Sequence, residues 1–169
     1  MRINEPAPDF RLPDLYGDMV QLKDFRGKIV IINFWSCECP HSERTDRELM
    51  AMFVQWRDDV VLLPVAANRI ETPQAIAEAA RLRRLPPVLM DADHIVADLY
   101  RAQTTPEVFI IDRDGILRYA GAVDDTSFRQ KRPTRFYVDE AVEALLDGRL
   151  PALAETPAYG CAIVREAVE

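Results

Sequence analysis

The sequence predicts an α/β fold in which helices flank a central mixed β-sheet. A continuous apolar run, IVIINFW at residues 29–35, is typical of a central strand that is buried on both faces. Strand-like and helix-like patterns then alternate along the chain, as in a layered α/β domain. Asp114-Gly115 separates two further apolar segments and is a strong signal for an antiparallel hairpin. The sheet is therefore expected to be mixed.

The residues before this central strand predict a small β-hairpin. Short alternations of apolar and polar residues occur at 10–12 and 19–22, and Gly17 lies between them at the expected turn. The domain is therefore expected to begin with an N-terminal β-hairpin extension.

A helix is predicted to begin at Pro40, because proline is tolerated at the first position of a helix. Its apolar face consists of four side chains at helical spacing: Leu49, Met52, Phe53 and Trp56. The run VVLLPVA at 60–66 predicts the next strand. Pro64 within it removes a backbone donor and suggests a sheet edge or a bulge.

The second half of the chain predicts shorter elements. Thr72-Pro73 is a cap and first-residue pair for a helix that runs toward Leu85. The elements that follow are a strand at 88–90, a helix at 93–100, hairpin strands at 107–112 and 116–119, and an amphipathic helix that ends before Gly148. We expect one domain at residues 1–150 and a C-terminal tail at 151–169.

Composition excludes several classes of function. The chain has 169 residues, of which 49% are hydrophobic, and its net charge is −7. An isoelectric point near 4.9 argues against a nucleic-acid partner, and the basic cluster at 129–135 is interpreted as a solvated loop. No apolar leader and no run of 18 apolar residues occurs, so we expect no membrane partner and a cytoplasmic location.

Two of the three cysteines flank a single glutamate, in the order Cys37-Glu38-Cys39. In a reducing compartment three cysteines do not form a structural disulfide framework. Thiols this close are metal ligands, a redox pair, or one reactive thiol with a bystander. The surrounding residues have to decide among these three possibilities.

Cys39 is the strongest candidate for a reactive thiol. It directly precedes Pro40, so it lies at a helix N-terminus, where unpaired N–H groups and the helix dipole stabilise a thiolate. A protonated His41 would lower the pKa of Cys39 further, and the Ser42 hydroxyl would donate to its sulfur. The Glu38 carboxylate acts in the opposite direction.

Three segments of the sequence resemble the thioredoxin-like redoxins, which include the AhpC/TSA-type peroxiredoxins and the membrane-anchored or soluble thiol–disulfide oxidoreductases. They are "PAPDFRLPDLYGDMVQLKDFRGK", "GKIVIINFWSCECPHS", and Thr105-Pro106 ahead of "EVFIIDRDG". The resemblance covers roughly residues 5–148 and implies a thioredoxin-like fold. It also implies a cis-proline loop at Thr105-Pro106 that faces Cys39, presents backbone groups to a substrate, and shares the substrate site with Trp35.

This resemblance further implies the partners of the protein, which would be a disulfide or peroxide substrate and an external thiol reductant, with no cofactor and no metal. The departures from the family narrow the activity. Ser42 stands where thioredoxins have the second cysteine of Cys-x-x-Cys, so the motif is monothiol. Peroxiredoxins carry Pro-x-x-x-Thr-x-x-Cys and a later arginine, where this chain has Ile32, Ser36 and Pro106. We therefore expect a thiol–disulfide oxidoreductase that uses Cys39, with a weak peroxidase as the alternative.

The tail carries the third cysteine. "ETPAYGCAIV" at 155–164 resembles the Thr-Pro-Ala-x-Gly-Cys segment of a peroxiredoxin-like redoxin subgroup. Pro151, Pro157 and Gly160 discourage regular structure in this tail, which would be free to fold back over the active site. Cys161 is therefore a candidate resolving thiol for Cys39, with simple packing as the alternative.

Two further readings stay open. Cys37 is a second candidate to resolve Cys39, although a Cys-x-Cys disulfide closes a small strained ring, so a bystander role is equally expected. A copper carrier of the Sco type would use Cys37, Cys39 and His41. Such carriers pair Cys-x-x-x-Cys with a histidine after a late strand, where this chain has Asp112-Arg113.

Overall fold

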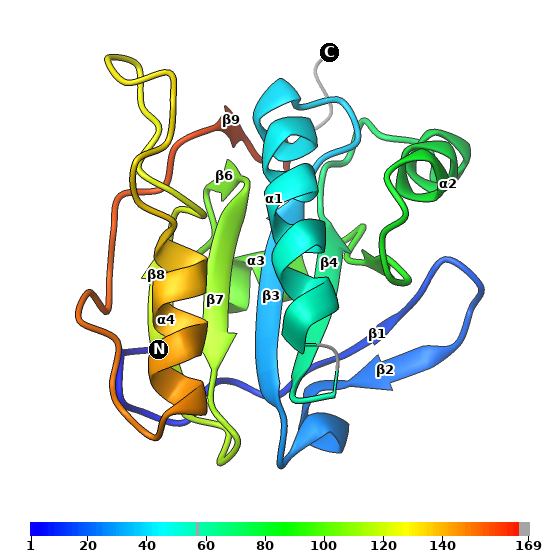
Figure 1. Ribbon diagram of the computed structural model, residues 1–169. Helices are drawn as coiled ribbons and strands as arrows, with labels where there is room; N and C mark the ends of the chain where they lie inside the picture. Colours follow the sequence, from blue (N-terminus) through cyan, green and yellow to red (C-terminus); the bar gives the residue numbers. More distant parts are fainter. Residues whose placement is uncertain (57, 166–169) are drawn as a thin grey trace.

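The computed structural model describes residues 1–56 and 58–165 (Figure 1). Its strands and helices, in chain order, are β1 (Arg11–Pro13), β2 (Met19–Gln21), the 3₁₀ helix η1 (Leu22–Phe25), β3 (Ile29–Trp35), α1 (Pro40–Trp56), β4 (Val60–Ala66), α2 (Pro73–Leu82), β5 (Leu89–Met90), α3 (Ile95–Leu99), β6 (Thr104–Thr105), β7 (Glu107–Ile111), β8 (Leu117–Gly121), α4 (Tyr137–Leu146) and β9 (Cys161–Ala162).

The central sheet has the strand order β5-β4-β3-β7-β8. Strands β4 and β5 run parallel to β3, whereas β7 is antiparallel to β3 and pairs with β8 as a hairpin. β1 and β2 form the expected antiparallel N-terminal hairpin. The predicted mixed sheet, its two central strands and the hairpin at Asp114-Gly115 are confirmed.

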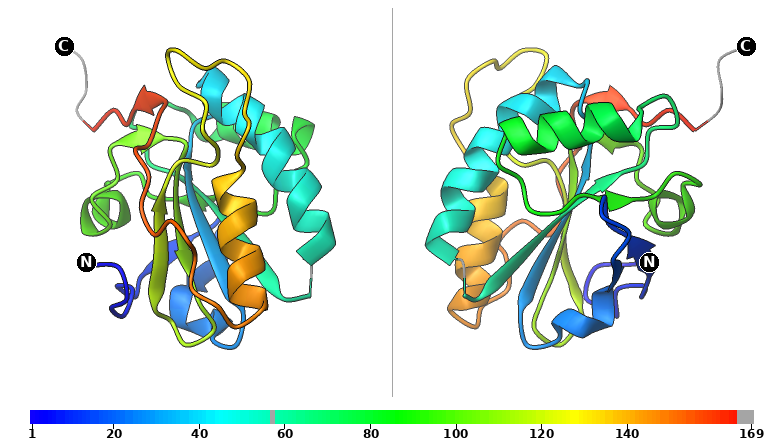
Figure 2. Two further views of the ribbon diagram at one scale, coloured as in Figure 1. Left: turned by 60° about the vertical axis from the view of Figure 1, so that its left-hand side comes forward. Right: turned by 90° about the vertical axis from the view of Figure 1, so that its right-hand side faces the viewer.

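Helices cover both faces of the sheet because β3 points apolar side chains to both sides (Figures 1 and 2). Ile29 and Ile31 pack on the side of α1 and α4. The intervening side chains of β3 pack on the opposite side against Tyr100, which directly follows α3, and Phe10, which directly precedes β1. A third cluster joins the end of β3 to α2 through Trp35 and Ile76.

Two local predictions have definite outcomes. Pro64 does not lie in an edge strand, because β4 is second in the sheet; however, β5 pairs only with Val65 and Ala66, so Pro64 adjoins a single strand, β3. The predicted cap of α2 is confirmed, since the Thr72 hydroxyl accepts the N–H of Ala75 at 3.2 Å.

The described part of the tail is an ordered element that packs on the domain. After α4 it runs along β8, where the N–H of Ala120 bonds to Ala154 and the N–H of Thr156 bonds back to Ala120, and it then reaches β6 (Figure 2, left). There β9 pairs antiparallel with β6. The expectation that this segment lacks regular structure is wrong at 161–162, because β6 supplies a partner strand that the local sequence does not reveal.

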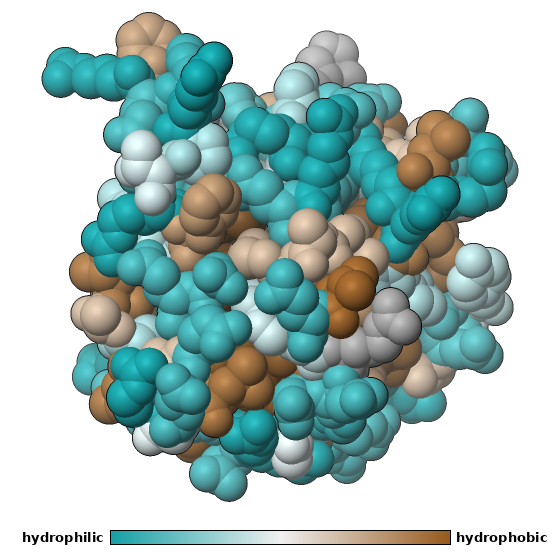
Figure 3. Space-filling model, viewed as in Figure 1, coloured by the Kyte–Doolittle hydropathy of each residue, from teal (hydrophilic) through white to brown (hydrophobic). Residues whose placement is uncertain are grey.

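On the face shown in Figure 3 hydrophilic residues predominate, and hydrophobic residues lie among them near the middle of the view. The basic cluster at 129–135 is an exposed loop, as predicted from its composition. Within the described residues, no helix combines the length and the apolar character needed to cross a bilayer.

Candidate active site

The loop that carries Cys37 and Cys39 connects the end of β3 to the start of α1, at the upper edge of the sheet in Figure 1. Pro40 is the first residue of α1, and the first helical bond runs from the N–H of Glu43 to the carbonyl of Cys39 at 3.1 Å. Cys39 therefore occupies the predicted position at a helix N-terminus, and it is 97% buried, with 3% of its surface exposed.

Ser36 fixes the shape of this loop. Its hydroxyl oxygen accepts the backbone N–H groups of Glu38 and Cys39, each at 3.2 Å, and its proton is donated to the carboxylate of Glu71. The same carboxylate accepts the N–H of Glu38 at 3.2 Å. Glu71 is buried and comes from the loop before α2, so no motif near the cysteines predicts it.

Several hydrogen-bond donors converge on the sulfur of Cys39. Burial raises the pKa of this thiol, but the donors outweigh burial and hold the pKa below its usual value. They are the thiol of Cys161, the backbone N–H of Ser42, the hydroxyl of Thr105 and the backbone N–H of Cys161. When protonated, the Cys39 thiol donates to the carbonyl of Thr105 at 3.2 Å. The structure thus supports the lowered pKa predicted for Cys39.

Ser42 and His41 act differently from the prediction. Ser42 is fully buried and stabilises the Cys39 sulfur through its backbone N–H, while its hydroxyl accepts the N–H of Ser36 at 3.3 Å. The His41 ring packs edge-on against Tyr159 of the tail, with 4.8 Å between the ring centroids. His41 therefore contacts the segment that leads to Cys161.

Cys37 has an environment opposite to that of Cys39. Burial, the charge of the Glu71 carboxylate and a hydrogen bond to it raise the pKa of the Cys37 thiol to about 12, and Glu38 acts in the same direction. The carbonyl of Cys37 accepts a hydrogen bond from Arg83 at 2.8 Å. Cys37 is therefore held as a neutral thiol that donates to Glu71.

Trp35 does not present a face to a substrate, since its side chain is fully buried. Its indole N–H donates to Asp46 at 2.7 Å, and Arg83 donates to the same carboxylate at 3.1 Å and lies over the indole ring. Burial raises the pKa of Asp46 to about 6, although both donors oppose this shift. Trp35 thus packs in the core beneath the loop that carries Cys37 and Cys39. The sequence offers one signal for Asp46, which lies three residues before Leu49 on the apolar face of α1.

Thr105 and Pro106 form the expected cis-proline loop, with a cis peptide bond between them, and it faces Cys39. The backbone of Thr105, predicted to face a substrate, instead faces the tail in this structure, because β9 pairs Thr105 with Cys161. Burial and the neighbouring Cys39 raise the pKa of the Cys161 thiol to about 11. The structure therefore brings Cys39, Cys161, Ser42 and the Thr105-Pro106 loop together.

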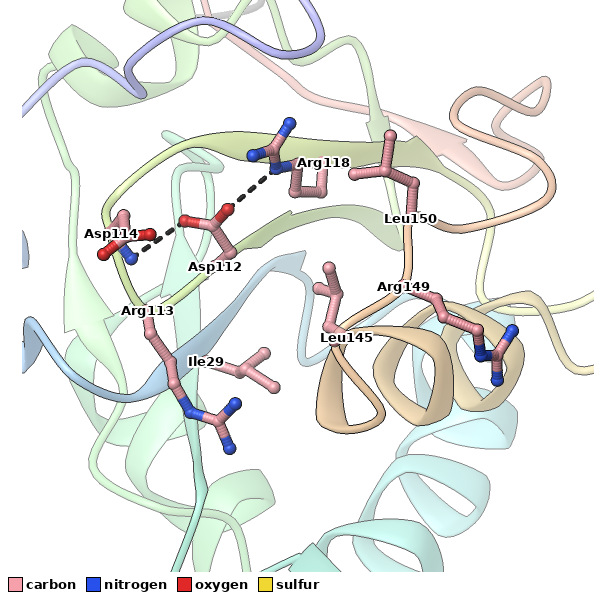
Figure 4. A pocket seen from close by; sticks show the side chains of 9 residues that line it. Ile29, Asp112, Arg113, Asp114, Arg118, Leu145, Arg149 and Leu150 are labelled. Carbon is pink, nitrogen blue, oxygen red and sulfur yellow. Dashed lines mark hydrogen bonds and ion pairs between the residues drawn. The ribbon is translucent and has the colours of Figure 1, made fainter.

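One hollow on the surface lies far from the cysteine loop. A hollow of about 230 Å³ lies between the β7–β8 turn and the end of α4, and it includes Ile29 at the opposite end of β3 from the cysteine loop (Figure 4). Its Arg118 donates to Asp112 at 2.7 Å. Among residues 1–56 and 58–165, no group of three or more His, Cys, Asp or Glu side chains is arranged to hold a metal ion, so the copper-carrier reading gains no structural support.

Comparison with known families identifies the chain. The model of the AhpC/TSA family matches residues 3–120. The chain belongs to the AhpC/TSA family. The thiol–disulfide oxidoreductase ResA of Bacillus thuringiensis is 31% identical over 116 residues, which are 68% of this AhpC/TSA protein and 66% of ResA. The chain thus spans just under two thirds of the length of this relative.

Solved structures confirm the thioredoxin-like fold. A thioredoxin domain of a thiol–disulfide oxidoreductase from Bacteroides vulgatus matches with a TM-score of 0.64 at 20% identity, covering 78% of this chain and 93% of that domain. A hypothetical protein from Sinorhizobium meliloti matches with a TM-score of 0.89 at 26% identity, covering 99% of this chain and 97% of its own. The second match includes the tail of this AhpC/TSA protein.

Proposed function

We propose that this protein is a thiol–disulfide oxidoreductase that attacks protein or low-molecular-weight disulfides through Cys39. One observation carries the proposal: Cys39 combines a helix N-terminus, several donors on its sulfur and a lowered pKa at the cis-proline loop. The attacking species in disulfide exchange is the thiolate, and donors that stabilise a thiolate raise its fraction at neutral pH.

In the proposed reaction the Cys39 thiolate attacks one sulfur of a substrate disulfide. A bond forms between the two sulfurs, the substrate S–S bond breaks, and one substrate thiolate leaves and takes up a proton. A second thiol then resolves the mixed disulfide by thiol–disulfide exchange, and an external thiol reductant finally returns Cys39 to its thiolate form. The backbone N–H groups of Ser42 and Cys161 are fixed in space, so they stabilise the recovered charge without moving.

The environment of Cys37 supports the choice of Cys39 as the nucleophile. A thiol whose pKa is about 12 carries almost no thiolate near pH 7, and its partner Glu71 is itself an anion. The loop therefore contains one activated thiol, Cys39, and one thiol that stays protonated, Cys37. The similarity to ResA supports the same reaction class, while the substrates and the reductant of this protein are part of the proposal. The cytoplasmic location stays a prediction.

The alternative function is a peroxidase, and the position of Ser36 indicates that any peroxidase activity is weak. Ser36 is the only hydroxyl that this chain retains from the peroxiredoxin motif, and its proton is already donated to Glu71. Ile32 has no exposed surface and lies in the core. A peroxide that approached Cys39 would find no cationic side chain at the position of Pro106 to stabilise the leaving oxygen.

The test compares single-cysteine variants in the reduction of hydroxyethyl disulfide, with a dithiol as the reductant. Cys39→Ser is expected to abolish the protein-dependent rate, while Cys37→Ser retains most of it. The rate constant with hydrogen peroxide is expected to be close to that of a free thiolate. Activity that survives in Cys39→Ser but is lost in Cys37→Ser would refute the assignment, and rapid peroxide turnover would establish the peroxidase instead.

A further inference from the structure

The tail holds Cys161 beside Cys39 through contacts along its whole described length. Near β8, the Thr156 hydroxyl bonds to the buried Tyr119 hydroxyl at 2.6 Å and accepts the N–H of Ala122 at 3.0 Å. At the far end, Val164 donates its N–H to Asn68 at 2.8 Å and accepts the N–H of Arg69 at 2.9 Å. These contacts anchor the tail on either side of Cys161.

Between these anchors, the tail lies directly on the cis-proline loop. Cys161 pairs with Thr105 and Ala162 with Thr104, and the N–H of Ile163 donates to Gln103 at 2.9 Å. Gly160 approaches so closely that a Cβ atom there would lie 2.1 Å from the carbonyl oxygen of Thr105. Only glycine fits at this position without moving β9 away from β6. The pairing of β9 with β6 therefore depends on residue 160.

The pairing of β9 with β6 brings the two cysteines together at Thr105, where their thiols hydrogen-bond to each other. The Cys39 thiol is 3.2 Å from the oxygen of Thr105, and Thr105 is the residue with which Cys161 pairs. Cys39 has only 3% of its surface exposed, whereas Cys161 is half-buried. Cys161 is therefore already next to Cys39, whereas an external thiol would first have to diffuse to it.

We propose that Cys161 is the resolving thiol of Cys39, delivered within the same chain by β9, so that the oxidised protein carries a Cys39–Cys161 disulfide. This proposal rests on the proposed function, because it supplies the second half of the cycle that Cys39 begins. It assigns a redox role to the tail and leaves Cys37 outside the reaction.

The two steps balance. Cys39 attacks the substrate disulfide and releases one substrate thiolate, which leaves a mixed disulfide between Cys39 and the other substrate sulfur. Cys161 then attacks the sulfur of Cys39, the remaining substrate sulfur leaves, and the proton of Cys161 passes to it. Two electrons move from the Cys39–Cys161 dithiol to the substrate, which becomes two thiols. An external dithiol restores the reduced protein.

The electrostatics of the pair change in the direction that the second step requires. In the reduced protein, the Cys39 thiolate and its hydrogen bond keep the proton on Cys161. Once Cys39 is in the mixed disulfide, its charge is gone, and of the causes that raise the pKa of Cys161 only burial remains. Cys161 thus becomes easier to ionise only after Cys39 has reacted.

The test treats the reduced full-length protein with oxidised glutathione and maps its peptides without reduction. The wild type and Cys37→Ser are expected to yield linked peptides that contain Cys39 and Cys161. Cys161→Ser keeps a hydroxyl donor beside Cys39 but has no resolving sulfur, so it is expected to stop at a glutathione adduct on Cys39.

A third variant tests the position of β9 against β6 with all three cysteines present. In Gly160→Ala, the rate at which the glutathione adduct converts to the intramolecular disulfide is expected to fall about tenfold or more, because a positioned thiol becomes a flexibly tethered one. Ala162→Ser changes an exposed residue of the same strand and is expected to behave as the wild type.

The outcomes separate the two proposals. A wild-type protein that accumulates a stable Cys39–glutathione adduct, or a Cys161→Ser variant that still forms an intramolecular disulfide, would overturn the resolving role of Cys161 and leave the proposed function in place. A wild-type protein in which Cys39 reacts with no disulfide at all would overturn both.

Discussion

Oxidation of the protein should raise its thermal stability strongly if Cys39 and Cys161 are linked. The two cysteines are 122 positions apart in the sequence. In the chain-entropy model, a crosslink that closes a loop of this size stabilises the folded state by roughly 5 kcal/mol, less any native strain. For a chain of this length, 1 kcal/mol shifts the melting temperature by about 2–4 °C, so the expected increase is about 10–20 °C.

The assay compares melting temperatures of the reduced and the oxidised protein, measured by calorimetry at one scan rate, for the wild type and Cys161→Ser. A disulfide between Cys37 and Cys39 would close a loop that contains only Glu38 between the two cysteines. The same model gives roughly 2 kcal/mol or less for it. An increase of only a few degrees in the wild type, or an equal increase in Cys161→Ser, would refute the reasoning.

Three further predictions concern single side chains. Glu71→Gln removes the anion beside Cys37, so the pKa of Cys37 should fall from about 12, and its alkylation should move to lower pH; an unchanged profile would contradict the role of Glu71. Cys161→Ala removes a donor to the thiolate and should raise the pKa of Cys39 in an alkylation titration, whereas Cys161→Ser should raise it less; equal shifts would show that this donor is unimportant. Tyr119→Phe should lower the free energy of unfolding in urea by about 1 kcal/mol, because the hydroxyl is buried and bonds to Ala122 and Thr156; no loss would mean that this anchor of the tail is dispensable.

The fold was largely predictable because its main elements have strong local patterns. β3 and β4 have the predicted bounds, since a short and mainly apolar run rich in β-branched residues is typical of a strand with neighbours on both faces. Pro40 and Thr72 mark the starts of α1 and α2, because proline and a capping hydroxyl act through the adjacent backbone. The position of Cys39 at a helix N-terminus follows from the same local rule.

The parts of the site that were missed depend on tertiary contacts. Glu71 lies 35 positions from Ser36, and nothing in its own neighbourhood indicates that it will be buried against the cysteine loop. β9 has two residues, which is too short for any periodic pattern, and it exists because β6 offers a partner. Trp35 was expected at the substrate site from a resemblance, but the position of a side chain at the end of a strand depends on the helix packed beneath it, which here is α2.

The most direct test of the central claim is the pH dependence of alkylation of each cysteine in the reduced wild-type protein. Iodoacetamide is small, and the midpoint of each titration, read by mass spectrometry of the three cysteine peptides, reports the pKa of that thiol independently of the absolute rate. We predict that Cys39 titrates below the usual range of a free cysteine, while Cys161 and Cys37 titrate only near pH 11 and 12, respectively. A midpoint for Cys37 below that of Cys39 would contradict the account.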